Sequence, residues 1–99
     1  MTAPAPLPDL VLYGKPGCHL CDDTRDALRS VFAERASAGL ANPELREADI
    51  LGDTDLTERY RDWIPVLALG ERELRLVTQP ARIRRLLADV IDGMGPNPG

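Results

Sequence analysis

The chain has 99 residues, of which 43% are hydrophobic and 28% are charged, and its formal net charge is -4 at pH 7. These values are typical of one compact soluble domain, and the acidic balance argues against a nucleic-acid-binding surface, which needs clustered positive charge. No apolar stretch approaches the roughly 20 residues that span a membrane, so we expect no contact with a membrane.

Proline and glycine mark both ends of the chain as tails. Prolines predict a disordered tail over residues 1–8, and glycines with prolines predict a second one over residues 93–99. The folded domain is therefore expected over residues 9–92. The first segment has neither the basic start nor the apolar core of a secretory signal, and the chain has no disulfide framework, so we expect a cytoplasmic protein.

A strand and a long helix are predicted first in the folded part. An apolar run predicts a strand over residues 10–13, and the segment Tyr13-Gly14-Lys15-Pro16-Gly17 then turns the chain. Apolar residues recur after it at helical spacing, which predicts a helix from near Cys18 to about Arg35, with Gly39 as its stop. The apolar positions of this helix are Leu20, Ala27, Leu28, Val31 and Phe32.

Three further strands and two helices are predicted in the rest of the chain. A hairpin turn at Gly70-Glu71 joins the last two strands, and Pro65 stands at the start of the first strand of that pair. The final helix follows Thr78, has Pro80 in its first turn and presents one apolar face. The expected strands cover residues 44–50, 64–69 and 74–77, and the short helix covers residues 55–60. The apolar face of the final helix consists of Ile83, Leu86, Leu87, Val90 and Ile91.

This order of elements predicts an α/β domain. The sequence strand, helix, strand, helix, strand, strand, helix gives a central four-stranded mixed sheet with helices on both faces. The first two strands are expected to be parallel because a helix connects them, and the last two antiparallel because a hairpin joins them.

The two cysteines, Cys18 and Cys21, stand at the predicted start of the first helix, separated by two residues. Unpaired N–H groups and the helix dipole favour a thiolate at such a position. A C-x-x-C pair in a strand–turn–helix is typical of a thiol–disulfide redox site, where one thiolate attacks and a second thiol resolves the mixed disulfide. We assign the attack to Cys18 and the resolution to Cys21, and we expect Lys15, the only lysine, to lower the pKa of Cys18.

Other interpretations of the cysteine pair remain open. A structural disulfide would close a loop of only four residues, which stabilises a fold little. Structural zinc needs about four ligands, whereas His19 is the only histidine, so only a site shared between chains could be complete. We expect no metal site within one chain and an exposed position for His19. The third alternative is a pair of inert buried thiols.

Ile64 and Pro65 open the strand that is expected beside the first helix. X-Pro bonds are trans in most folded proteins. We nevertheless expect a cis bond here, which would turn the Ile64 N–H and C=O toward Cys18. A substrate peptide would then pair with these two backbone groups.

The segment Lys15-Pro16-Gly17-Cys18-His19-Leu20-Cys21, with Ile64-Pro65-Val66 downstream, resembles the glutaredoxin branch of the thioredoxin superfamily. It looks in particular like small bacterial glutaredoxin-like proteins with a P-G-C-H-L-C motif, and the resemblance covers about residues 10–90. It implies a thioredoxin fold, a cis-proline at Pro65, a nucleophilic Cys18 and a contact between Lys15 and a carboxylate of glutathione.

One region departs from the glutaredoxin pattern. Glutaredoxins usually carry a Gly-Gly pair before the last helix that grips the γ-glutamyl end of glutathione, whereas this chain reads Arg75-Leu76-Val77-Thr78-Gln79-Pro80. Thr78 and Gln79 are the polar residues expected to bind substrate there. This departure leaves glutathione as a candidate co-substrate rather than a tightly bound cofactor.

These observations together predict a monomeric thiol–disulfide oxidoreductase that reduces protein or glutathione mixed disulfides, with no tightly bound cofactor. A second class of function stays open. The chain could be a thioredoxin-fold binding module whose cysteines share a metal or iron–sulfur centre between chains, or are redox-inert. A bound cluster would colour the purified protein, whereas an empty dithiol would not.

Overall fold

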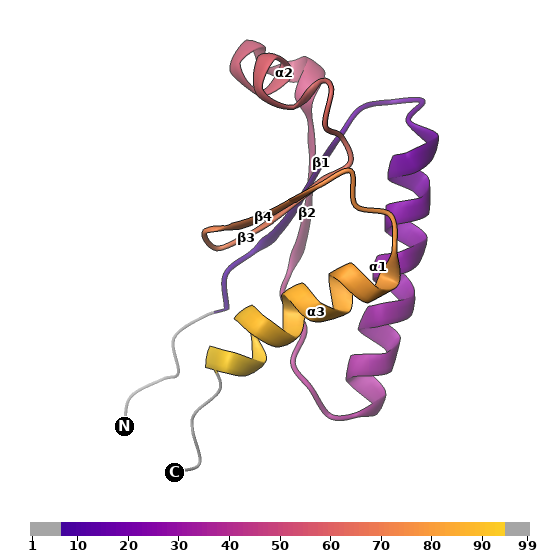
Figure 1. Cartoon of the computed structure of the whole chain (residues 1–99), viewed down its shortest axis with the longest axis vertical. Coiled ribbons are helices and arrows are strands. Elements are labelled where there is room, and N and C mark those ends of the chain that lie inside the picture. The colour runs from indigo at the N-terminus through magenta and orange to yellow at the C-terminus, as the bar shows by residue number, and fades with distance from the viewer. Residues whose placement is uncertain (1–6, 95–99) are drawn as a thin grey trace.

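The structure is a computed structural model that describes residues 7–94 (Figure 1). The predicted tails lie outside the described residues except at residues 7–8 and 93–94. Leu7 is partly buried against the main core, which is the larger of the two clusters of buried side chains in the domain. The 3-10 helix η2 (Asp92–Met94) follows the last helix. The other elements are β1 (Leu10–Gly14), α1 (His19–Ser37), β2 (Leu45–Asp49), η1 (Ile50–Gly52), α2 (Thr54–Tyr60), β3 (Val66–Leu69), β4 (Arg72–Arg75) and α3 (Pro80–Val90), where η marks a 3-10 helix.

The four strands form one mixed sheet in the order β2-β1-β3-β4. β1 is parallel to β2 and antiparallel to β3, and β3 is antiparallel to β4 across the Gly70-Glu71 turn. The predicted α/β architecture, with its parallel first strands and its C-terminal hairpin, is therefore confirmed.

The sheet separates two groups of buried side chains. Neighbouring residues of a strand point to opposite faces, so Leu12 and Leu67 pack with α1 and α3, whereas Tyr13 and Val66 pack with Tyr60 of α2. Figure 1 shows α1 and α3 together on one side and α2 apart from both. The sheet therefore buries its leucine-rich face under two long helices and leaves its other face to a smaller cluster.

The long helix α1 carries the buried stripe that the periodicity predicts, with one correction. Leu20 is 50% exposed, because the buried stripe begins one residue later, at Cys21, and continues through Thr24 and Leu28 at spacings of three and four. Gly39 ends the helical turn with a φ of 76°, a conformation that glycine adopts at no steric cost. None of the helices within residues 7–94 is long and apolar enough to cross a membrane.

β4 begins and ends two residues earlier than predicted. Leu69 pairs with Arg72 across the two-residue turn Gly70-Glu71, so β4 starts directly after this turn. Leu76 then leaves the strand with a φ of 53°, and Val77 enters the main core instead of continuing the strand. This departure carries the chain toward α1 before α3 begins.

Candidate functional site

Cys18 and Cys21 lie where the turn after β1 meets the first turn of α1. Cys18 is the N-cap residue of α1, and its Sγ accepts a hydrogen bond from the Cys21 N–H at 3.2 Å. The two Sγ atoms form a disulfide bond, and the Cα atoms lie 5.2 Å apart. Cys18 is partly exposed and Cys21 is fully buried. Of the two cysteines, Cys18 is the one that a partner molecule can approach.

Lys15 lies in the same turn, next to a charged cleft. The Cys18 N–H donates to the Lys15 C=O at 3.3 Å, so the contact of Lys15 with the cysteine is through its backbone. The exposed Lys15 and three other charged residues, Arg25, Glu47 and Asp49, line a cleft of about 240 Å³. Arg25 forms ion pairs with Glu47 at 2.7 Å and with Asp22 at 2.6 Å. Charged groups that could meet a polar substrate therefore border the turn that carries Cys18.

Ile64 and Pro65 precede β3, and the peptide bond between them is cis. Ile64 belongs to the same buried cluster as Cys21, with Cys18 packed against that cluster. The Ile64 N–H, however, donates to the Tyr60 C=O at 3.1 Å. The pairing of a substrate with both backbone groups of Ile64 therefore stays a prediction. The N–H already has a partner at the end of α2, so a substrate that pairs with it must displace this hydrogen bond.

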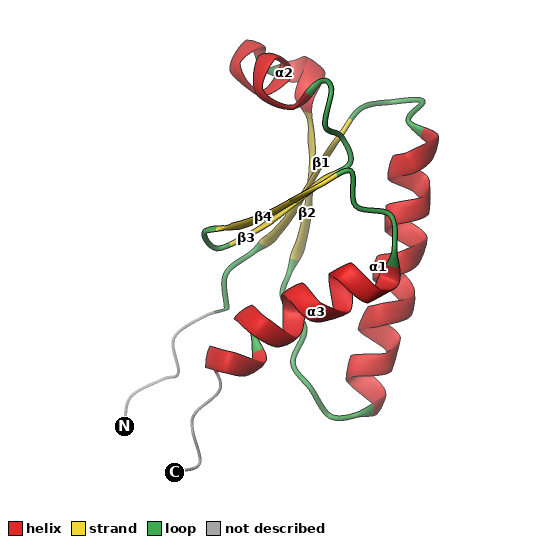
Figure 2. Ribbon diagram, viewed as in Figure 1, coloured by secondary structure: helices red, strands yellow, loops and turns green. Residues whose placement is uncertain are grey.

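The loop that carries Thr78 and Gln79 is tied to both α1 and Pro65 through Val77. The Val77 N–H donates to the Pro65 C=O at 3.1 Å, and the Val77 C=O accepts a hydrogen bond from Thr24 Oγ1 at 2.6 Å. Thr78 is partly buried, while Gln79 is the exposed N-cap of α3 and makes no capping hydrogen bond with its side chain. Figure 2 shows this loop, the loop before β3 and the turn after β1 approaching the same end of the sheet.

Thr24 is a site-shaping residue that the sequence alone does not single out. It is fully buried, and its Oγ1 also lies 2.9 Å from the Leu20 C=O in the preceding turn of α1. The only signal in the sequence is a hydroxyl residue within the apolar stripe of a helix, three positions after Cys21. Its hydroxyl fixes the loop before α3 against the helix that carries the cysteines.

Two stacked tyrosines and a glutamate form the wall of the site on the α2 side. The rings of Tyr13 and Tyr60 stack with centroids 4.6 Å apart, and the Tyr60 hydroxyl donates to Glu73 Oε2 at 2.6 Å. This hydrogen bond lowers the pKa of Glu73, with a further contribution from Arg75, while burial raises the pKa of Tyr60. Glu73 is therefore ionised and Tyr60 neutral at pH 7. Nothing in the sequence pattern points to Glu73.

Gly14, the last residue of β1, leaves the space that the Cys21 sulfur occupies. A Cβ atom at position 14 would lie 2.8 Å from Cys21 Sγ, which is shorter than a normal van der Waals contact. We expect Gly14→Ala to lower the free energy of unfolding by about 1–3 kcal/mol, because the buried disulfide cannot move aside freely. Urea unfolding of the oxidised protein measures this effect.

Gly52 offers a matched control for Gly14. A Cβ atom at Gly52 would meet nothing within 4 Å. Gly52→Ala should therefore leave the stability unchanged or raise it slightly. Equal stability of the Gly14→Ala variant and the wild type would contradict the tight fit at Cys21.

The residues within 7–94 contain no group of three or more His, Cys, Asp or Glu side chains arranged to hold a metal ion. His19 is exposed at the first position of α1, as expected of a spacer between the cysteines.

The chain is similar to a known protein family and to solved structures. A model of the glutaredoxin-like domain (DUF836) matches residues 9–90. The X-ray structure of target protein XcR50 from X. campestris is 30% identical with a TM-score of 0.66, covering 81% of this chain and 96% of that chain. The solution NMR structure of protein Ne2328 from Nitrosomonas europaea is 32% identical with a TM-score of 0.60, covering 94% of this chain and 96% of that chain. No curated protein matches the chain.

The matched segment contains the cysteine turn, Pro65 and the loop before α3, and the sheet and helices agree with the two solved structures. The chain therefore belongs to the family of glutaredoxin-like domains and has a thioredoxin-like fold.

Proposed function

We propose that the protein is a thiol–disulfide oxidoreductase of the glutaredoxin-like type, which reduces protein or glutathione mixed disulfides. The supporting observation is the asymmetry of the cysteine pair. Cys18 is partly exposed at the N-cap of α1, and the fully buried Cys21 lies behind it at disulfide-bonding distance. This arrangement suits a reaction in which the first thiol meets the substrate and the second resolves the intermediate.

The reaction starts from the reduced pair. The Cys18 thiolate attacks one sulfur of the substrate, a new S–S bond forms, and the bond within the substrate breaks to release a thiolate that takes a proton from water. The Cys21 thiol then loses its proton to water and attacks Cys18 Sγ, which releases the second substrate thiolate. The cysteine pair is oxidised by two electrons and the substrate is reduced by two. Two equivalents of an external thiol, for which glutathione is the candidate co-substrate, reduce the pair again and leave as a disulfide.

Several groups around Cys18 support this chemistry. The Cys21 N–H already points at Cys18 Sγ in the disulfide form, and N–H groups at a helix start stabilise a thiolate after reduction. We assign substrate contacts to the Ile64 C=O beside Pro65, to Lys15 and to Thr78 and Gln79. A reducing cytoplasm, which we propose as the location, would keep the pair ready to attack.

The titration of Cys18 tests the proposal. In Cys21→Ser, Cys18 is the only thiol, so its rate of alkylation by iodoacetamide as a function of pH reports its thiolate fraction. We expect a pKa below the ordinary cysteine value of about 8.5. We also expect the wild-type protein to reduce a glutathione mixed disulfide catalytically. An ordinary thiol pKa, together with no turnover of small or protein disulfides, would contradict the proposal.

A further inference from the structure

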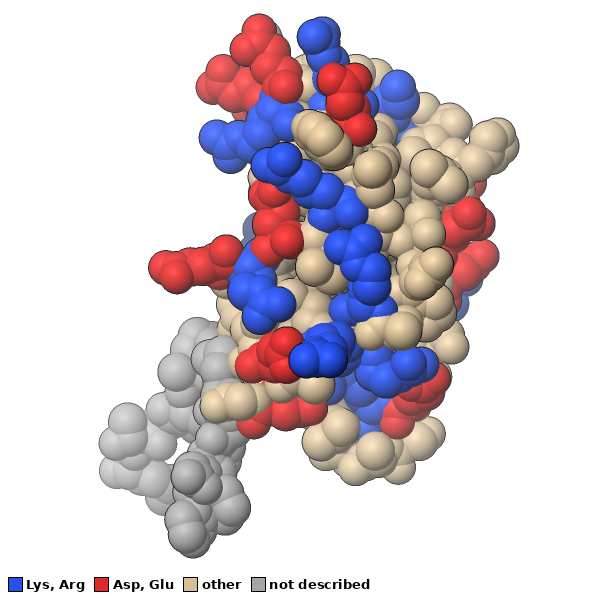
Figure 3. All heavy atoms as spheres, in the orientation of Figure 1, with Lys and Arg blue, Asp and Glu red and all other residues tan. Residues whose placement is uncertain are grey.

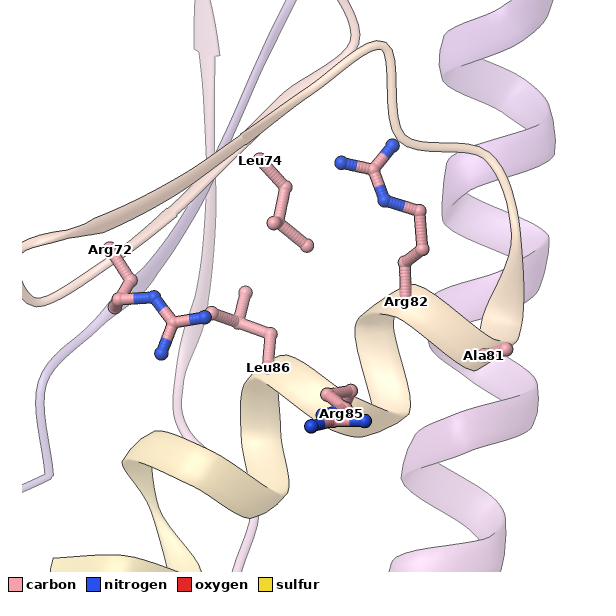
Figure 4. A pocket seen from close by; sticks show the side chains of 6 residues that line it. All are labelled: Arg72, Leu74, Ala81, Arg82, Arg85 and Leu86. Atoms are coloured by element: carbon pink, nitrogen blue, oxygen red, sulfur yellow. The ribbon is translucent and has the colours of Figure 1, made fainter.

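A cleft with an apolar floor and an arginine rim lies between β4 and α3, apart from the cysteine turn. Its volume is about 250 Å³. Figure 4 shows Leu74 of β4 and Leu86 of α3 pointing toward each other, with the side chains of Arg72 and Arg82 on either side of them. Arg85 and Ala81 complete the lining. A ligand that fits here combines an apolar group for the floor with negative charge for the rim.

The positive charge of this rim is poorly balanced by the protein itself. Arg72 and Arg85 share one carboxylate, that of Asp89, and each lies 3.8 Å from it. Arg82 donates to the Arg75 C=O at 3.3 Å and forms no ion pair with a carboxylate of residues 7–94. Three guanidinium groups thus meet one distant carboxylate, although the whole chain carries a net charge of -4. A polyanionic ligand would supply the missing negative charge.

The basic surface extends beyond the cleft toward the redox site. Figure 3 shows lysine and arginine side chains in a nearly continuous band across the face formed by β4 and α3. Next to the cleft, Arg75 pairs with Glu73 at 3.0 Å and lies over the ring of the exposed Trp63 at 5.3 Å. The Leu76 N–H donates to the Trp63 C=O at 3.0 Å. Trp63 directly precedes Ile64 and Pro65. A ligand on the band therefore runs toward the strand that borders the cysteines.

We propose that this cleft and the basic band around it, formed by Arg72, Arg75, Arg82 and Arg85, dock an acidic, extended segment of a partner protein. An apolar side chain of the segment enters the cleft between Leu74 and Leu86, and flanking carboxylates pair with the arginines. β4 is one of the two edge strands of the sheet, so an extended segment can lie along it. The proposal depends on the oxidoreductase function only in that the docked partner would bring the disulfide.

A protein segment fits these observations better than a nucleic acid. Phosphates would gain from the arginines, but the apolar floor offers them nothing, and the net charge of -4 repels a nucleic acid as a whole. The band also includes Arg75, which does not line the cleft, and this favours an occupant larger than a single small anion.

Fluorescence anisotropy of the full chain tests the docking surface. The probe is a labelled peptide of alternating leucine and glutamate without cysteine, and the comparison probes are the same peptide with lysine for glutamate and a single-stranded oligonucleotide. We expect the acidic peptide to bind at low ionic strength, with the lysine peptide much weaker. The double variant Arg82→Glu/Arg85→Glu should weaken the acidic peptide about tenfold or more, because two attractive contacts become repulsive.

Two arginines elsewhere provide the matched control. Arg29 on α1 and Arg46 on β2 are exposed and pair with Asp26 and Asp9. Arg29→Glu/Arg46→Glu changes the net charge equally, yet it should alter the affinity less than about twofold, because the change lies outside the band. Circular dichroism verifies the fold of each variant. If the variant Arg82→Glu/Arg85→Glu does not fold, the variant Arg82→Gln/Arg85→Gln is used in its place. We then expect a smaller loss of affinity for the acidic peptide.

The outcomes separate the docking surface from the oxidoreductase function. Equal losses in both double variants, or no loss in either, would overturn the docking surface in favour of general charge attraction. Tighter binding of the oligonucleotide, lost on charge reversal at 82 and 85, would overturn it in favour of a nucleic-acid site. If the wild type binds the acidic peptide as expected but fails to reduce small disulfides, docking stands and the oxidoreductase function fails.

Discussion

Cys18→Ser is expected to lower the rate of disulfide reduction by roughly a thousandfold or more. The hydroxyl that replaces the thiol is not ionised and cannot form the mixed disulfide. Cys18 is the partly exposed member of the pair, so the buried Cys21 cannot take its place. Reduction of a glutathione mixed disulfide and of a protein disulfide, measured at equal protein concentrations, checks this loss. Activity of Cys18→Ser close to that of the wild type would remove the proposed nucleophile.

Cys21→Ser is the matched variant, and it should separate the two steps of the reaction. It keeps the attacking thiol, so a substrate that a second external thiol can resolve should still turn over. A protein disulfide, by contrast, should leave Cys18 trapped as a mixed disulfide, which intact-mass spectrometry detects. Equal loss on both kinds of substrate, with no trapped species, would contradict the role of Cys21 as the resolving thiol.

Arg35→Met is expected to lower the free energy of unfolding by about 3 kcal/mol, the largest loss of stability that we predict. Arg35 is 4% exposed and donates to both Asp92 carboxylate oxygens, at 2.7 and 3.1 Å. It also donates to Asn42 Oδ1 at 3.1 Å and to the Ala41 C=O at 2.6 Å. Methionine keeps the apolar stem but removes the buried guanidinium that donates to all of these acceptors. Urea unfolding measures the change.

Arg84 provides the control for this effect, because it makes an equally short bidentate pair at the surface. It donates to the Glu34 carboxylate at 2.9 and 3.0 Å, but both side chains are about half exposed. Arg84→Met should therefore change the stability little, since water replaces the lost contacts. A loss at Arg84 as large as the loss at Arg35 would show that burial is not what makes the Arg35 network matter.

The pH dependence of stability should identify the Arg35–Asp92 pair. The hydrogen bond from Arg35 lowers the pKa of Asp92 in the folded protein. A depressed carboxyl pKa contributes stability above the unfolded-state value of about 3.9, and this contribution disappears as the pH falls through the lower folded value. The difference between the wild type and Arg35→Met should therefore narrow below about pH 4. A constant difference over that range would contradict the ion pair.

The sequence predicts the reactive part of the site because that part is local. The spacing of Cys18 and Cys21 and their position at a helix start follow from neighbouring residues, and so does the turn that contains Lys15. The supporting part is not local. The hydrogen bond from Thr24 to Val77 joins residues 53 positions apart, and Tyr60 reaches Glu73 from a different element. The Ile64 N–H finds its partner, the Tyr60 C=O, only because of how α2 ends.

Periodicity, turn residues and cysteine spacing by themselves determined the order of strands and helices, the parallel and antiparallel pairs and the place of the thiols. These features depend on interactions between residues close together in the chain, which a pattern of side chains records directly. Only the tertiary structure decided which backbone groups are already paired, which residues hold the loop before α3, and that arginines from β4 and α3 meet around one cleft. Those outcomes depend on packing between distant segments, where each contact exists only after the sheet and helices have come together.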